Sequence, residues 1–149
     1  MEKTTNALDA VLRKTRPEQL GQYIDDNRGE LISDVKPFAR YMRACIREKG
    51  MRQQEVFIRA DLSESYGYKI ISEEKHTNQR DTILRLCIGA RLSLEQTQRA
   101  LKIYGMSPLY ARMPRDAVIM VSLGGSADIA EINELLLKHQ MNVLKGTES

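Results

Sequence analysis

The segment from Gln53 to Ser72, QQEVFIRADLSESYGYKIIS, limits the fold of this chain more than any other. Its apolar residues recur at helical spacing in two short runs, which predicts one helix over 53–60 and a second helix after Ser63. The connection that contains Asp61 is short enough to be a tight turn. Ser63 is a good helix cap because its hydroxyl accepts a hydrogen bond from an amide of the first turn. The segment therefore predicts two short helices that pack across each other.

The second of these helices has two distinct faces. The inner face contains Leu62, Tyr66 and Ile70, whereas the outer face contains Glu64, Ser65, Tyr68 and Lys69. An exposed polar face on the second helix of such a pair is what contact with the major groove of DNA requires. DNA binding is therefore one hypothesis. The alternative is ordinary helix packing without DNA binding, because any cluster of three packed helices contains two helices that are joined by a short turn.

The composition agrees with a helical protein. Hydrophobic residues make up 42% of the 149 residues, but aromatic residues only 5%, and Trp is absent. The core must therefore consist of Leu, Ile, Val, Met and Ala, which favours an all-α fold. No apolar run is long enough to cross a bilayer, and the N-terminus lacks the pattern of a signal peptide. We expect a soluble cytoplasmic protein without a membrane partner.

Positive charge is concentrated around the opening segment. The net charge is +3, and residues 37–80 carry nine Lys and Arg against six Asp and Glu. A helix predicted from Pro37 to about Lys49 places one series of basic side chains on its outer face: Arg40, Arg43 and Arg47. Arg52, Lys75 and Arg80 follow in sequence. These cations either contact a polyanion or cover solvated helix faces.

The N-terminal residues 1–35 predict a helical arm without chemical function. Asn6 to Arg13 has apolar residues at helical spacing, and Thr15 followed by Glu18 predicts the capped start of a second short helix.

The last part of the chain contains an internal repeat. With an offset of 35 residues, RDTILRLCIGARLSLEQTQRALKIYGMSPL of Arg80–Leu109 aligns with RDAVIMVSLGGSADIAEINELLLKHQMNVL of Arg115–Leu144. Each copy predicts a helix, a Gly-containing turn and a second helix with a capping box, which begins at Ser93 in one copy and at Asp128 in the other. Residues 117–123 could form a buried strand, but alignment with the first copy predicts a helix. The residues after Leu144 are expected to fray.

The final predicted helix has a wide apolar stripe: Ile132, Leu135, Leu136 and Leu137. The stripe is either a surface for a dimer or protein partner, or part of the ordinary core.

Catalytic motifs are missing from the sequence. His76 and His139 have no metal-ligand spacing around them, and Gly124-Gly125-Ser126 lacks the Lys of a phosphate-binding loop. Cys45 and Cys87 lie among apolar residues, as buried free thiols do. We expect neither enzymatic activity nor a cofactor nor a metal.

Residues 36–104 resemble the family of phage Cro and lambda-type repressors, also called xenobiotic-response-element-type regulators. The pattern that carries the resemblance is Gln53, Val56, Phe57, Asp61, Leu62, Ser63 and Ile70. The resemblance implies a five-helix module that contains a helix-turn-helix. Phe57 stands where the family has a small residue, Asp61 where it has Gly, and Gly67 where it has a buried apolar residue. Gly67 is expected to offset the added volume of Phe57.

The resemblance also implies roles for single residues. Gln53 would contact a phosphate, and Ser63 would cap the second helix and reach the phosphate backbone. The residues at or near base edges would be Glu64, Ser65, Tyr66 and Lys69, with Tyr68 as the alternative aromatic residue to Tyr66. Family members commonly bind double-stranded DNA as dimers on near-palindromic sites, which implies a homodimer on the nucleoid.

The sequence thus predicts three parts: a helical arm over 1–35, a lambda-repressor-like helix-turn-helix domain over 36–105, and a C-terminal helical hairpin over 106–149 that repeats the last two helices of that domain. The predicted function is sequence-specific transcription regulation by occupancy of an operator or promoter. The alternative is a protein-interaction adaptor that retains the helix-turn-helix scaffold without DNA affinity.

Overall fold

The computed structural model describes residues 5–26 and 36–146. Within these ranges the regular elements are α-helices and one short 3-10 helix, which confirms the all-α fold class. The chain divides into two compact units, residues 1–35 and 36–149. Among the described residues, no helix combines the length and the apolar character needed to cross a membrane.

The first unit consists of α1 (Thr5–Arg13), the 3-10 helix η1 (Pro17–Gln19) and α2 (Leu20–Asp26). The predicted cap at Thr15 is wrong. Its hydroxyl donates backwards to the carbonyl of Val11 at 2.9 Å, so it closes α1 instead. The reciprocal contact lies one residue later, where the Arg16 N–H donates to the Gln19 side chain at 3.2 Å. Residues 27–35, the rest of the predicted arm, lie outside the described ranges.

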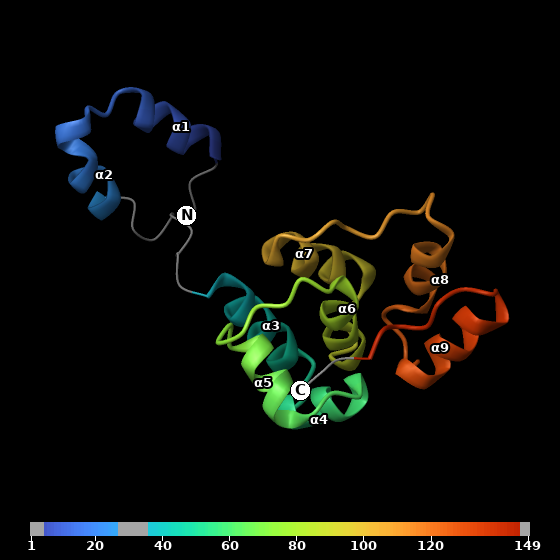
Figure 1. Cartoon of the computed structure of the whole chain (residues 1–149). Helices are drawn as coiled ribbons and strands as arrows, with labels where there is room; N and C mark the ends of the chain where they lie inside the picture. The colour runs from blue at the N-terminus through green and yellow to red at the C-terminus, as the bar shows by residue number, and fades with distance from the viewer. Residues whose placement is uncertain (1–4, 27–35, 147–149) are drawn as a thin grey trace. The chain divides into compact units, whose positions relative to one another are not determined.

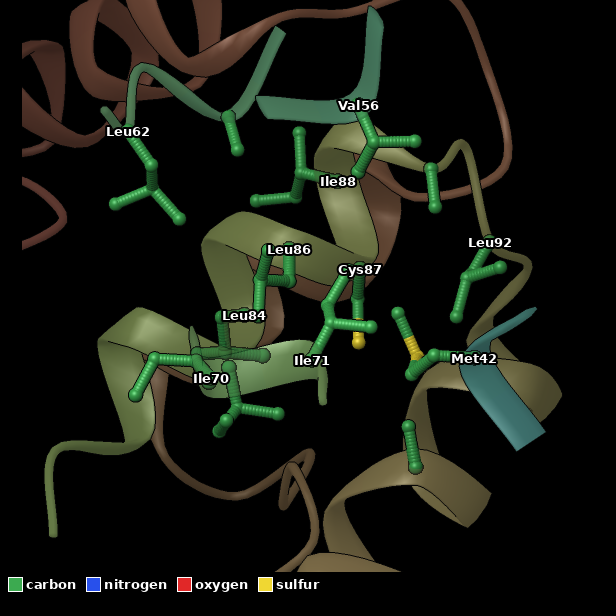
Figure 2. Close-up of a cluster of buried hydrophobic side chains, with 14 of the residues drawn as sticks. Met42, Val56, Leu62, Ile70, Ile71, Leu84, Leu86, Cys87, Ile88 and Leu92 are labelled. Carbon is green, nitrogen blue, oxygen red and sulfur yellow. The ribbon is translucent and has the colours of Figure 1, made fainter. Parts of the chain in front are cut away.

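The second unit contains α3 (Pro37–Glu48), α4 (Gln53–Ala60), α5 (Glu64–Ile71), α6 (Arg80–Gly89), α7 (Leu94–Tyr104), α8 (Pro114–Ser122) and α9 (Ile129–Lys138). Helix α6 contacts α4, α7 and α9, and every residue from Thr82 to Ala90 is buried. Figure 1 shows α6 between the group of α3, α4 and α5 and the α8–α9 pair. Figure 2 shows its side chains Leu84, Cys87 and Ile88 within the apolar core.

The predicted helix pair of the second repeat is confirmed. Residues 117–122 belong to α8, so tertiary packing overrides the β-branched residues in this stretch. Both capping boxes form: Ser93 accepts from the Gln96 amide at 3.1 Å, and Asp128 accepts from the Glu131 amide at 2.9 Å. The expected fraying after Leu144 is wrong for Lys145, whose N–H donates to Asp81 at 2.8 Å.

The apolar stripe of α9 lies partly in the core and partly at the surface. Ile132 and Leu136 are buried in the core, whereas Leu137 is 63% exposed. The stripe is therefore mostly core packing, with one side left at the surface.

Candidate nucleic-acid interface

The turn between α4 and α5 is fixed by backbone geometry. Asp61 adopts the left-handed conformation at φ 55° and ψ 48°, which Asp tolerates better than most residues. The Leu62 amide then donates to the Phe57 carbonyl at 3.0 Å. Ser63 caps α5, since its hydroxyl accepts from the Tyr66 amide at 3.2 Å. The turn thus sets where α5 begins and in which direction it runs.

The close contact between α4 and α5 depends on Gly67. A Cβ atom at Gly67 would lie 2.4 Å from Cδ1 of Phe57, well inside van der Waals contact. Phe57 is itself buried, so its ring occupies the space that a side chain at position 67 would take. The expected compensation between the two residues is confirmed. It makes the crossing of the two helices tight rather than adjustable.

The outer face of α5 consists of the expected polar residues with one correction. Glu64, Ser65, Tyr68 and Lys69 are exposed, and Tyr68 retains 47% of its accessible area. Tyr66 is only 8% exposed, because it lies on the same side of the helix as Ile70. This burial does not agree with the predicted contact of Tyr66 with base edges, and Tyr68 is the aromatic residue on the outer face.

Lys75 lies just beyond the end of α5 and packs on this buried tyrosine. Its ammonium is 5.1 Å from the centre of the Tyr66 ring, which is a cation–π distance. Lys75 itself is exposed. The Tyr66 ring thus holds a positive charge near the C-terminal end of α5.

The start of α4 presents a second group of polar residues. Arg52 precedes the helix, and its Nε is 3.3 Å from Glu55, with side chains that are 81% and 47% exposed. Such a surface ion pair contributes little stability, so the guanidinium can exchange partners. Gln53 is the first residue of α4 and is half-buried. In α3, Arg40 and Arg47 are exposed and Arg43 is half-buried.

Arg80 has another role than either interpretation of the sequence. Its guanidinium forms a bidentate pair with Asp116 and also donates to the carbonyl of Pro108 at 3.2 Å. It is committed to contacts inside the protein and is neither a free cation nor part of a solvated face.

Sequence reasoning missed Arg85, a buried cation behind the α4–α5 turn. Its guanidinium donates to the carbonyls of Ala60 at 3.1 Å, Leu144 at 3.0 Å and Lys145 at 2.9 Å. Burial lowers the pKa of Arg85, and the carboxylate of Asp61, 3.8 Å away, opposes that shift. Arg85 thus ties the end of α4 to the C-terminal segment. Its position among apolar residues of α6 was the only signal, and the sequence does not show its partners.

Metal and thiol chemistry lack support in the part of the chain that the structure describes. It contains no group of three or more His, Cys, Asp or Glu that could hold a metal ion. Both cysteines are free and buried, and burial raises the pKa of Cys87 to about 12. That thiol therefore stays protonated at neutral pH.

No family model, curated protein or solved structure matches this chain. The function must therefore be inferred from the geometry of the site. The arrangement offers one exposed polar helix face with a rigid support behind it, flanked by cations.

Proposed function

We propose that this protein is a sequence-specific DNA-binding transcription regulator that acts by occupying an operator or promoter. In this proposal α3 to α7 form a lambda-repressor-like module, and α4 and α5 are its helix-turn-helix. The observation that carries the proposal is the contrast between the two sides of α5. Its inner side is locked by the Gly67–Phe57 contact and the Ser63 cap, while its outer side is polar and exposed.

The outer face of α5 has donors and acceptors suited to base edges in the major groove. Lys69 can donate to guanine, and Ser65 can donate or accept. Glu64 is repelled by phosphate, but its carboxylate can accept from the amino group of cytosine. Tyr68 adds an aromatic ring on the same face, where it can contact a thymine methyl group. These four residues would determine sequence preference.

Residues around this face would hold the phosphate backbone. Gln53 and Arg52 lie at the start of α4, where backbone amides and the helix dipole favour an anion. Arg43 and Lys75 add positive charge from α3 and from the end of α5. Each such contact contributes to affinity without sequence preference and weakens as salt rises.

The test is to measure binding of the full chain to a duplex selected from a random pool and to a scrambled duplex, across a salt series. The affinity should fall steeply as salt rises. Lys69→Ala should relax base preference at one position with a loss of about 1–3 kcal/mol on the selected duplex. Arg43→Ala should weaken binding to both duplexes and reduce the salt slope by about one. Lys138→Ala, which removes an exposed lysine of α9, is the matched control and should bind as the parent does.

Circular dichroism of each variant separates lost contacts from lost folding, which matters for the half-buried Arg43. If neither duplex binds at low salt, DNA regulation is wrong. The alternative is then a protein-interaction adaptor on the same scaffold. The observation that favours this alternative is the exposure of apolar side chains on the C-terminal helices, with Val121 80% and Leu137 63% exposed.

A further inference from the structure

The two copies of the repeat bind each other through reciprocal ion pairs. Arg80 of the first copy forms a bidentate pair with Asp116 of the second. Arg115 of the second copy forms a bidentate pair with Asp81 of the first, at 3.1 and 2.9 Å. In the alignment Arg80 corresponds to Arg115 and Asp81 to Asp116. The same two residue types thus exchange partners between the copies.

The backbone contacts follow the same offset of 35 residues. Arg80 donates to the Pro108 carbonyl at 3.2 Å, and Arg115 donates to the Val143 carbonyl at 3.0 Å. Asp116 accepts from the Tyr110 amide at 2.9 Å, and Asp81 accepts from the Lys145 amide at 2.8 Å. Gln98 accepts from the Leu109 amide at 2.7 Å, and Asn133 accepts from the Leu144 amide at 2.8 Å. Each of these three contacts thus has its equivalent in the other copy.

Reciprocity of this kind is the property of a symmetric dimer interface, where residue i of one subunit meets residue j of the other and j meets i. Here both halves belong to one chain. The α6–α7 hairpin is therefore paired with an internal copy of itself, through polar contacts that include the nearly buried Asp116, whose side chain is 5% exposed.

The second copy brings no second DNA-contacting face. Helix α8 follows the loop after α7, so the second hairpin has no equivalents of α4 and α5. The pair of hairpins consequently carries one exposed α5, whereas a symmetric dimer would carry two. The side of α6 that meets α9 is already occupied within the chain.

We propose that α8–α9 takes the place of a second copy of the chain, so that the protein functions as a monomer and its DNA target is a single asymmetric half-site. The DNA part rests on the proposed function. The inference replaces the homodimer on a near-palindromic site that the family resemblance implies. A single module also makes fewer phosphate contacts, so its affinity depends less steeply on salt than that of a dimer.

Sedimentation equilibrium of the full chain over a wide concentration range tests the monomer directly. The expected mass is that of one chain, 17.0 kDa. A dimer contradicts the proposal whichever face forms it. If a dimer appears, Leu137→Glu shows whether the exposed side of α9 is responsible, because a buried carboxylate would separate the subunits.

The stoichiometry on DNA tests the target. Duplexes selected from a random pool are trimmed to the shortest bound site, and that site is then placed once or as an inverted pair. The single site should bind one chain, and the inverted pair should bind two chains without cooperativity. Binding only to the inverted pair, or cooperative binding to it, overturns the proposal. A 17.0 kDa monomer that binds no duplex supports the replacement of a second chain by α8–α9 and contradicts the proposed DNA function. The two failures are therefore distinguishable.

Discussion

The α6–α7 hairpin and the α8–α9 hairpin share the reciprocal ion pairs and three further polar contacts, yet they differ sharply in burial. Every residue from Thr82 to Ala90 of the first hairpin is buried, whereas only Asp116 and Ile119 of α8 are. Val121 of α8 is 80% exposed. The shared contacts fix how the hairpins meet. The neighbours of each hairpin decide how much of it becomes core. The first hairpin packs against α4 as well as against the second hairpin.

The aligned glycines show the same divergence. A Cβ atom at Gly89 would lie 2.4 Å from the carbonyl oxygen of Val56, so this glycine permits the close approach of α4. Gly124 has nothing nearer than Ser93 Cα at 3.7 Å, but its φ of +82° lies in the left-handed region. One glycine provides space and the other provides a backbone conformation. Coincidence in an alignment therefore does not imply the same physical role.

The largest expected effect comes from alanine at Gly89, and alanine at Gly124 is the comparison. Gly89→Ala should lower the free energy of unfolding by about 3 kcal/mol, because the clash is with backbone and α4 must move. Gly124→Ala should lower it by about 1 kcal/mol, the cost of a left-handed non-glycine residue. Urea unfolding followed by circular dichroism measures both values.

Gly125→Ala is the control for this pair, since a Cβ there would meet nothing within 4 Å. Alanine is favoured over glycine inside a helix by about 1 kcal/mol. If Gly89→Ala stabilised the protein by that amount, α4 would be free to yield and the close approach would not be a constraint.

The reciprocal ion pairs provide the next test. Asp116→Arg should lower the free energy of unfolding by about 2–3 kcal/mol, because it leaves Arg80 facing a like charge at a site that is largely desolvated. The double variant Arg80→Asp with Asp116→Arg restores opposite charges and should recover part of that loss. Thermal and urea unfolding of four proteins, the parent, Arg80→Asp, Asp116→Arg and the double variant, measure this coupling.

The equivalent change Asp81→Arg extends the comparison to the other pair. Asp81 is more exposed than Asp116, with 16% of its side chain accessible against 5%, so its reversal should cost less. Equal losses would show that burial does not differentiate the two pairs. Strictly additive effects in the double variant would contradict a direct interaction between Arg80 and Asp116.

Much of the local structure could be predicted from sequence because it depends on near neighbours. The bounds of α4, the Ser63 cap and both capping boxes follow from residue types a few positions apart. The Gly67–Phe57 compensation could also be predicted, since both residues depart from one pattern at positions where the helices touch.

The misplaced or missed residues depend on distant partners. Helical spacing places Tyr66 on the inner face of α5, whereas the family resemblance places it near base edges, and its burial in the core agrees with the spacing. The carbonyls that hold Arg85 lie at positions 60, 144 and 145, in segments that no local pattern connects to α6. The repeat was visible in sequence, but alignment shows equivalence and not contact. The exchange of partners between Arg80 and Arg115 therefore required the structure.

The smallest expected effect is a pH dependence of the stability that Asp81 contributes. Burial raises its pKa, but the hydrogen bonds from Arg115 and from the Lys145 amide outweigh burial and hold the pKa below its ordinary value. Because the pKa is lower in the folded state, the stabilisation is complete above about pH 4 and is lost as the pH falls through the folded-state pKa. In urea unfolding, Asp81→Asn should therefore be less stable than the parent at neutral pH, and the difference should shrink in acid. Arg115→Ala should lose less stability than the parent as the pH falls, since it removes the partner that lowers the pKa of Asp81. Parallel pH profiles for the parent and both variants would mean that this half of the reciprocal interface contributes no charge-dependent stability.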